Sequence, residues 1–269
     1  MSDIDRVALI TGASRGIGAA TARLMAGSGY RVALVATSRP DLETVASEIS
    51  ATGGQALTIA GDLADLDFAK RAVDETCANW GRIDVLVNNA AWRELISMRR
   101  ISPESWDKTL KVCLTAPAFL ARWAAENMQQ RSRGVIINVS SIMSQRAAGI
   151  SPAYIASKGG LEALTYELAS LYGPSGIRVL TVQPGAIDTE LSRDLDRQTE
   201  QADEIRAYSE DMIMLGRWAK AEEVARVILF LASDDAAYIT ATTLTVDGGW
   251  LHQHFPLSLK QRQFREDYR

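Results

Sequence analysis

Three polar residues in the middle of the chain have types and spacing suited to proton transfer at an oxygen atom. Tyr154 and Lys158 are four residues apart, so on one continuous helix their side chains would share a face. A phenol has an ordinary pKa of about 10, and it becomes a useful base near neutrality only if the phenolate gains roughly 4 kcal/mol. A lysine ammonium about 4 Å away supplies a gross attraction of that order. Ser141 ends an apolar run and can donate a hydrogen bond to a substrate oxygen, so the sequence indicates a proton-transfer site centred on Tyr154.

A glycine-rich turn lies near the start of the chain, between an apolar run and a helical pattern. Glycines occupy positions 12, 16 and 18, directly after the apolar residues 7–10. They let the backbone turn sharply and approach a pyrophosphate, and the following helix offers unpaired N–H groups and a favourable dipole. This context favours a dinucleotide site over the alternative, a tight turn without a ligand.

Short aliphatic and β-branched runs alternate with longer amphipathic stretches along the chain. The runs predict buried parallel strands over residues 7–10, 32–35, 56–59, 84–87, 135–139, 179–182 and 244–246. The amphipathic stretches predict helices over residues 41–50, 65–80, 102–127, 154–172 and 221–232. Strands and helices in this alternation predict an α/β fold, a doubly wound parallel sheet with helices on both faces.

The composition narrows the class of protein. A chain of 269 residues with 47% apolar content can bury a full core, and it predicts one domain over residues 1–269. The net charge of −4 gives no general attraction for nucleic acid or anionic lipid. The first apolar run is too short for a signal peptide or a membrane span, and Cys77 and Cys113 lack metal or redox spacing. We therefore expect a cytoplasmic protein with reduced thiols and no nucleic-acid or membrane partner.

Further markers follow the glycine turn in a fixed order. They are Asn88-Asn89-Ala90, Ser141, Tyr154 with Lys158, Pro184-Gly185 and Asp247-Gly248-Gly249. With its Gly-x-x-x-Gly-x-Gly turn, the chain resembles the classical short-chain dehydrogenase/reductase family from about residue 7 to residue 249. The resemblance implies a seven-stranded Rossmann fold and hydride transfer between a nicotinamide cofactor and a small-molecule carbonyl or secondary alcohol. It also implies that Tyr154 is the general acid/base, that Ser141 polarises the substrate oxygen, and that Lys158 binds the nicotinamide ribose.

The residues after the second strand bear on which nicotinamide cofactor is used. An acidic side chain there would bind the ribose 2′-hydroxyl of NAD, but this chain has Ala36 followed by two hydroxyls and a guanidinium. Arg15 in the glycine turn can reach the same place, and arginine suits a phosphate. This combination is similar to that of bacterial β-ketoacyl carrier-protein reductases, so NADP(H) is expected to be preferred, with NAD(H) possible. The expected cofactor-binding residues are Gly12, Ser14, Arg15, Gly16, Ile17, Gly18, Thr37, Ser38, Arg39, Asp62, Leu63, Asn89, Ala90, Tyr154, Lys158, Pro184, Gly185, Ile187 and Thr189.

One expected catalytic position departs from the family pattern. Most members carry an asparagine whose main-chain carbonyl holds a water next to the lysine, and this chain has Cys113 there. Pro117, four residues later, has no N–H for the Cys113 carbonyl. Either this freed carbonyl preserves the proton relay, or Pro117 only kinks the helix for packing and the relay is impaired. The departure also leaves open a non-catalytic NADP(H)-binding sensor or regulatory module.

The substrate pocket, the lid, the tail and the assembly are expectations from the same resemblance. Candidate substrate residues are Trp92, Arg93, Ile142, Met143, Gln145 and Arg146. The polar stretch 188–211 is either part of a substrate lid over residues 188–215 or a solvated pair of helices. The tail, 250–269, either reaches across a subunit interface or is a loose terminus, and its two histidines lack a third metal ligand. A homotetramer built on the 154–172 helix is expected.

Overall fold

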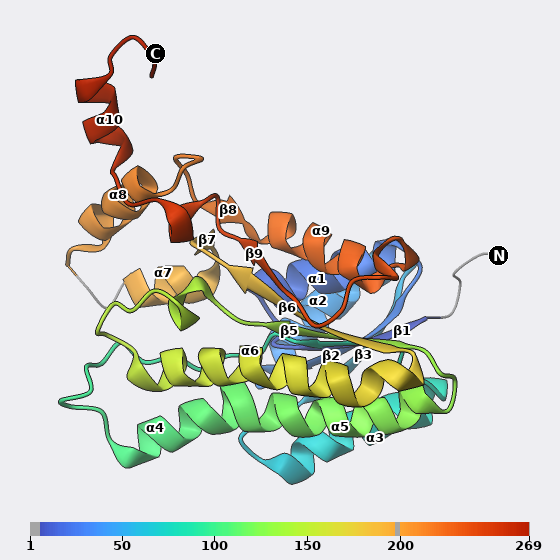
Figure 1. The fold of residues 1–269 in the computed structure, drawn as a ribbon. Helices are drawn as coiled ribbons and strands as arrows, with labels where there is room; N and C mark the ends of the chain where they lie inside the picture. Colours follow the sequence, from blue (N-terminus) through green and yellow to red (C-terminus); the bar gives the residue numbers. More distant parts are fainter. Residues whose placement is uncertain (1–5, 197–199, 269) are drawn as a thin grey trace.

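Seven parallel strands form the central sheet of this computed structural model, which describes residues 6–196 and 200–268 (Figure 1). The strands are β1 (Val7–Thr11), β2 (Arg31–Ala36), β3 (Gln55–Ala60), β4 (Val85–Asn88), β5 (Gly134–Val139), β6 (Ile177–Pro184) and β9 (Thr243–Val246). Their order across the sheet is β3-β2-β1-β4-β5-β6-β9. The predicted parallel sheet is confirmed. Its order reverses between β1 and β4, and open α/β sheets bind ligands at such a switch point.

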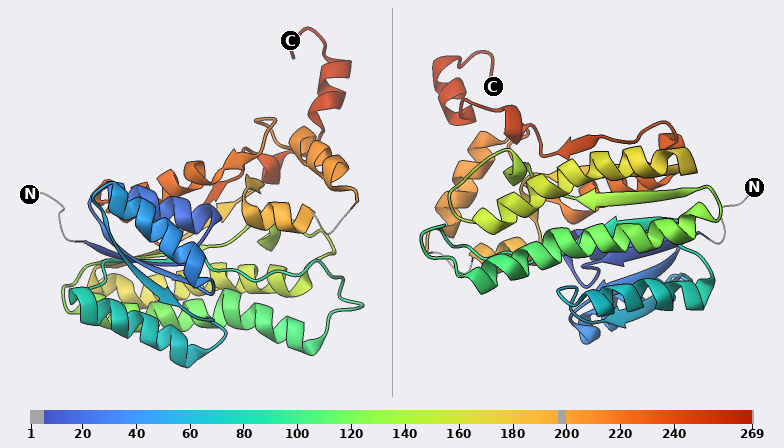
Figure 2. Two further views of the ribbon diagram at one scale, coloured as in Figure 1. Left: turned by 180° about the vertical axis from the view of Figure 1, so that it is seen from behind. Right: turned by 60° about the horizontal axis from the view of Figure 1, so that its bottom comes forward.

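Helices cover both faces of the sheet, as the alternation predicted (Figures 1 and 2). One layer consists of α1 (Gly16–Gly27), α2 (Arg39–Ala51) and α9 (Ala221–Ala232). The other consists of α3 (Leu66–Trp80), α4 (Pro103–Leu110), α5 (Ala116–Gln129) and α6 (Pro152–Tyr172). Because both sides are covered, β1, β4 and β5 are buried along their whole length, which explains their continuous apolar runs.

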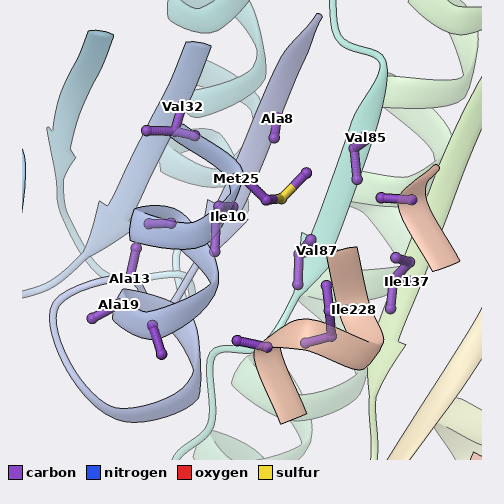
Figure 3. Packing of buried hydrophobic residues seen from close by; sticks show 14 of the residues in the cluster. Ala8, Ile10, Ala13, Ala19, Met25, Val32, Val85, Val87, Ile137 and Ile228 are labelled. Atoms are coloured by element: carbon purple, nitrogen blue, oxygen red, sulfur yellow. The ribbon is translucent and has the colours of Figure 1, made fainter. Parts of the chain in front are cut away.

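The core between the sheet and the first layer shows how the strands position the helices (Figure 3). Val87 of β4 and Ile137 of β5 have no exposed surface, and Met25 of α1 and Ile228 of α9 pack in the same cluster. Ile10 near the end of β1 and Ala19 near the start of α1 belong to the same cluster, so this packing holds the start of α1 against the end of β1. The glycine turn therefore lies on a rigid support at the carboxyl edge of the sheet.

The helix predicted over residues 102–127 is interrupted. A π-helical turn, η1 (Lys111–Thr115), separates α4 from α5, and the Ala116 N–H bonds to the Lys111 carbonyl five residues earlier. Pro117 lies in the first turn of α5, where its missing N–H removes an α-helical bond. The extra residue in the turn is how the chain accommodates this proline.

The carboxyl edge carries short elements that the sequence patterns did not resolve. β7 (Ile187–Asp188) pairs with β8 (Ala219–Lys220), and α7 (Glu190–Asp196) and α8 (Ala202–Met212) fall within the expected lid. In the part of the chain that the structure describes, four 3-10 turns complete the connections: η2 (Ile142–Ser144), η3 (Gly173–Ser175), η4 (Asp234–Ala236) and η5 (Trp250–His252). α10 (Leu257–Gln263) projects from the body beside α8 (Figure 1). Within the described ranges, no helix combines the length and the apolar character needed to cross a membrane.

Candidate active site

The glycine turn is held against the end of β4 by Asn89. The Asn89 Nδ2 donates to the carbonyls of Thr11, at 3.0 Å, and Gly12, at 3.2 Å. The Thr11 hydroxyl in turn accepts from the backbone N–H groups of Asn89, at 2.9 Å, and Ala90, at 3.0 Å. These four bonds cross the switch point between β1 and β4. They fix the turn in the place where a dinucleotide would cross the sheet.

Backbone conformation and the space available both require glycine in this turn. Gly12 has a φ of +65° and Gly16 a φ of +57°, in the left-handed region that favours glycine. A Cβ on Gly18 would lie 2.1 Å from the Gly12 carbonyl oxygen and 2.6 Å from Asn89 Nδ2. The turn thus folds back on the first turn of α1 so closely that only glycine fits at position 18.

A cavity of about 360 Å³ opens beside this turn and extends to the ends of β2 and β3. Predicted cofactor residues on its wall are Gly12, Ser14, Arg15, Gly16, Ile17, Thr37, Asp62, Leu63, Asn89, Ala90 and Thr189. Ser38 and Arg39 are not on this wall, because Ser38 is the N-cap of α2 and the exposed Arg39 begins that helix. Of these three predicted residues only Thr37 lines the cavity, and cofactor binding by Ser38 and Arg39 stays a prediction.

The glycine turn contacts two carboxylates of the same chain, and these contacts show whether its residues can bind an anion such as a phosphate. The Gly16 N–H donates to a carboxylate oxygen of Glu190 at 3.1 Å, and Arg15 forms an ion pair with Asp194 at 2.6 Å. Both acids belong to α7. An N–H at the start of α1 therefore holds an anion where the pyrophosphate of a dinucleotide would lie, and the Arg15 guanidinium holds a second anion beside the turn. The residues present fit a dinucleotide cofactor.

A second cavity, of about 590 Å³, brings together the three residues expected to transfer the proton. Ser141, Tyr154 and Lys158 all lie on its wall. Lys158 Nζ is 5.4 Å from the centre of the Tyr154 ring, and it donates to the Val139 carbonyl at 2.6 Å. Lys158 is only 2% exposed, so water screens its ammonium little from the groups around it. α6 supplies both residues one turn apart, as their spacing indicated.

A buried carboxylate beneath the serine was not found from the sequence. Glu162 of α6 is 9% exposed, and its Oε1 accepts from the hydroxyls of Ser140 and Ser144, each at 2.6 Å, and from Gln183 Nε2 at 2.9 Å. These bonds tie α6 to both sides of Ser141. Glu162 lies four residues after Lys158, a spacing that could have suggested a shared helix face, but nothing local identified its partners.

Cys113 lies under the cavities and not on their walls. It has no exposed surface, and its Sγ accepts from the Trp92 backbone N–H at 3.3 Å. The thiol therefore positions the loop after β4. The π-helical turn around it departs from a straight helix, in line with the expected effect of Pro117, and the proton relay through its carbonyl stays a prediction.

The predicted substrate residues are distributed over several places. Arg93, Ile142, Met143 and Arg146 line the larger cavity, together with the predicted cofactor residues Pro184, Gly185, Ile187 and Thr189. Trp92 instead lines the smaller cavity, where its ring lies 5.0 Å from Lys108 Nζ. Gln145 follows η2, is exposed and lines neither cavity, so its contact with the substrate stays a prediction.

Residues from the expected lid and tail complete the larger cavity. Ile205, Tyr208 and Ser209 of α8 lie on its wall, and so does Trp250 at the start of the tail. Arg146 donates to the Trp250 carbonyl at 3.1 Å and stacks 5.1 Å from its ring. Among the described residues, no group of three or more histidine, cysteine or acidic side chains is arranged to hold a metal ion.

The sequence matches a known family over most of its length. A family model described as enoyl-(acyl carrier protein) reductase matches residues 12–251. The cis-4-hydroxycyclohexanecarboxylate dehydrogenase of Sinomonas cyclohexanicum is 38% identical over 247 residues, which cover 91% of this chain and 96% of that protein. The 3-oxoacyl-[acyl-carrier-protein] reductase of Thermotoga maritima is 35% identical, with 91% and 97% covered.

Solved structures agree with this match. Levodione reductase superposes with a TM-score of 0.87 at 31% identity, covering 92% of this chain and 98% of that one. A short-chain type dehydrogenase/reductase from Mycobacterium marinum gives a TM-score of 0.85 at 32% identity, covering 92% and 96%. The fold, the matched residues and these relatives together show that the chain belongs to the short-chain dehydrogenase/reductase family and is an oxidoreductase acting on CH–OH donors.

Proposed function

We propose that this protein interconverts a small-molecule carbonyl and a secondary alcohol with NADP(H), and that Tyr154 transfers the proton. The observation that carries the proposal is the buried Lys158 ammonium 5.4 Å from the Tyr154 ring, on the wall of a cavity that also contains Ser141. The nicotinamide, when bound, supplies or accepts the hydride. Each side chain then has a distinct task at the substrate oxygen.

In the oxidising direction, the Tyr154 phenolate takes the proton of the substrate hydroxyl while a hydride leaves the carbinol carbon. The two electrons of the C–H bond leave with the hydride, and the O–H pair becomes the second bond of the carbonyl. The Ser141 hydroxyl donates to the reacting oxygen, and Lys158 stabilises the phenolate through its positive charge. In the reducing direction, Tyr154 returns the proton to the alkoxide. Either way, the proton and the charge are exchanged inside a cavity walled by side chains.

The printed names of the relatives set the range of substrates to test. They include a hydroxycyclohexanecarboxylate dehydrogenase, an L-rhamnose 1-dehydrogenase, a D-threitol dehydrogenase and acyl-carrier-protein reductases. The decisive experiment follows NADPH oxidation with ketones, acyl thioesters and aldonolactones, and NADP⁺ reduction with the matching alcohols and sugars. Turnover of at least one carbonyl–alcohol pair is expected. Tight cofactor binding without any turnover would instead support a non-catalytic NADP(H)-binding sensor. The observation that favours this second function is Cys113, at the position where most family members have asparagine.

The preference for NADP(H) rests on Arg15 and on the absence of an acid at the end of β2. Ala36 and Thr37 line the cofactor cavity at this point, and Arg15 of the glycine turn lines the same cavity. Wild-type protein is expected to bind NADPH at least about tenfold more tightly than NADH, since the guanidinium can pair with the 2′-phosphate.

The substitution Ala36→Asp is expected to reverse this order, because a carboxylate would repel the phosphate and accept a bond from the ribose hydroxyl. Binding is measured by the change in fluorescence of each reduced cofactor. Glu75→Asp on α3, away from both cavities, serves as the matched control. An Ala36→Asp protein that still prefers NADPH, or a wild type that prefers NADH, would overturn the cofactor assignment.

Assembly, lid and location are part of the same proposal. α6 exposes Leu171 on the face away from the core, where a second copy would cover it in a homotetramer. α8 walls the larger cavity, which supports a lid over residues 188–215. A cytoplasmic location accords with Cys77 and Cys113, which are both free thiols.

A further inference from the structure

Arg93 is a partly buried cation on the wall of the larger cavity, next to the residue proposed to transfer the proton. Its guanidinium carbon lies 5.3 Å from the centre of the Tyr154 ring. Burial lowers the pKa of Arg93, and the nearby Tyr154 phenol raises it. Placing a cation in such a position costs free energy unless an anion compensates it. The surroundings of the guanidinium therefore show what it could bind.

Among the described residues, this guanidinium has one hydrogen-bond partner. Its Nε donates to the Ser151 hydroxyl at 3.0 Å. Within the described part of the chain, neither terminal nitrogen has a hydrogen-bond acceptor and no acidic side chain forms an ion pair with Arg93. The adjacent Glu94 accepts from Ser105 instead. Both terminal nitrogens thus remain available on the side of the cavity.

The position of Arg93 relative to Tyr154 is fixed by the backbone. The Ser151 hydroxyl also donates to the Glu94 carbonyl at 3.1 Å, and the Ile96 N–H donates to the Ile150 carbonyl at 2.8 Å. These bonds tie the loop after β4 to the residues just before α6, which carries Tyr154. The Arg93 guanidinium is therefore preorganised and needs little ordering when a ligand binds.

The charges and surfaces of the cavity define the ligand further. No aspartate or glutamate is among the described residues of its wall, and the cations are Arg93, Arg146 and Lys158. Arg146 already uses a terminal nitrogen for the Trp250 carbonyl, and Lys158 donates to the Val139 carbonyl, whereas Arg93 uses only its Nε toward the described residues. Most of the remaining wall is apolar, including Leu95, Ile142, Met143 and Ile150. A planar guanidinium fork with free donors matches a carboxylate through two parallel hydrogen bonds.

We propose that the substrate is an organic anion, a hydroxy or oxo carboxylate with an apolar frame, whose carboxylate is bound by Arg93 while its reacting oxygen meets Tyr154. This inference rests on the proposed function for the reacting oxygen, but the carboxylate site itself can be tested without turnover. Arg93 then acts as a specificity-determining residue. Neutral isosteres of the substrate bind more weakly because they cannot form the ion pair with Arg93.

The test uses ligands that cannot react. Cyclohexanecarboxylate, benzoate and hexanoate, each paired with its amide, are titrated calorimetrically into full-length protein saturated with NADPH. At least one carboxylate is expected to bind about 30-fold or more tightly than its amide, and Arg93→Gln is expected to remove that difference. Arg93→Lys keeps the positive charge but not the planar guanidinium, and it is expected to retain part of the difference in affinity between the carboxylate and its amide. Arg23→Gln, an exposed arginine of α1 paired with Glu48, is the matched control and keeps the full difference.

Turnover provides a second and separate arm. For 4-oxocyclohexanecarboxylate and its methyl ester, Arg93→Gln is expected to lower kcat/KM for the acid about 30-fold more than for the ester. An effect of the lost cation on Tyr154 alone would lower both equally and would contradict a carboxylate site. Equal affinity of acids and amides in the wild type, or an acid preference that survives Arg93→Gln, overturns the inference. If acids bind through Arg93 but no carbonyl compound is turned over, the anion site stands and the proposed reaction fails.

Discussion

Replacing Tyr154 with phenylalanine is expected to lower kcat by about two to four orders of magnitude while cofactor binding stays within about twofold of the wild type. The reason is that only the phenol hydroxyl of this residue exchanges a proton with the substrate oxygen. The ring remains in place beside Lys158 and Arg93, so the shape of the cavity is preserved. Steady-state kinetics and a cofactor titration on the same preparation measure the two effects separately.

The same helix offers a matched control for this substitution. Tyr166 also lies in α6, is 48% exposed, and makes one hydroxyl contact with Thr243 at 3.2 Å. Tyr166→Phe therefore removes the same atom from the same helix outside the cavity, and it is expected to leave kcat unchanged within about twofold. A Tyr154→Phe protein with wild-type turnover would show that another group transfers the proton.

Replacing Gly18 with alanine is the second large effect that the structure predicts. A Cβ at this position would lie 2.1 Å from the Gly12 carbonyl oxygen, which is backbone and has no flexible end to yield. We expect the free energy of unfolding to fall by about 1–3 kcal/mol through overpacking. Because the glycine turn must move away, the affinity for NADPH is expected to fall at least about tenfold. Chemical denaturation and cofactor titration provide the two measurements.

Gly27→Ala provides the comparison within the same helix. A Cβ on Gly27 meets nothing within 4 Å, so the added methyl group has space. Alanine is the better helix former, and this variant should be as stable as the wild type or slightly more stable, with unchanged cofactor affinity. Equal behaviour of the two variants would show that the close approach of Gly18 to the turn is not needed for binding.

Short apolar runs were sufficient to predict the strands of the sheet, because parallel strands buried on both faces are continuous stretches of apolar residues. The seven expected runs correspond to β1–β6 and β9, with boundaries shifted by one or two residues. The interruption by η1 was harder to predict. Pro117 indicated a disturbance four residues upstream, but a proline alone does not distinguish a kink from a π-helical turn.

The site was predictable where its chemistry is local in the sequence. Tyr154 and Lys158 share a helix face, and the spacing of Gly12, Gly16 and Gly18 is contained in one turn. Contacts between segments that are distant in the sequence could not be predicted from local residue patterns. The Glu162 carboxylate binds serines about 20 residues away, and Glu190 meets Gly16 across the whole fold.

The most direct test of the account follows one hydrogen atom. NADPH carrying deuterium at the transferring C4 position is incubated with wild-type protein and 4-oxocyclohexanecarboxylate, and with the other carbonyl compounds of the panel. The account predicts an alcohol with one deuterium on the carbinol carbon for each cofactor oxidised, at a rate that Tyr154→Phe reduces. Bound cofactor that never delivers deuterium to any carbonyl compound would contradict it.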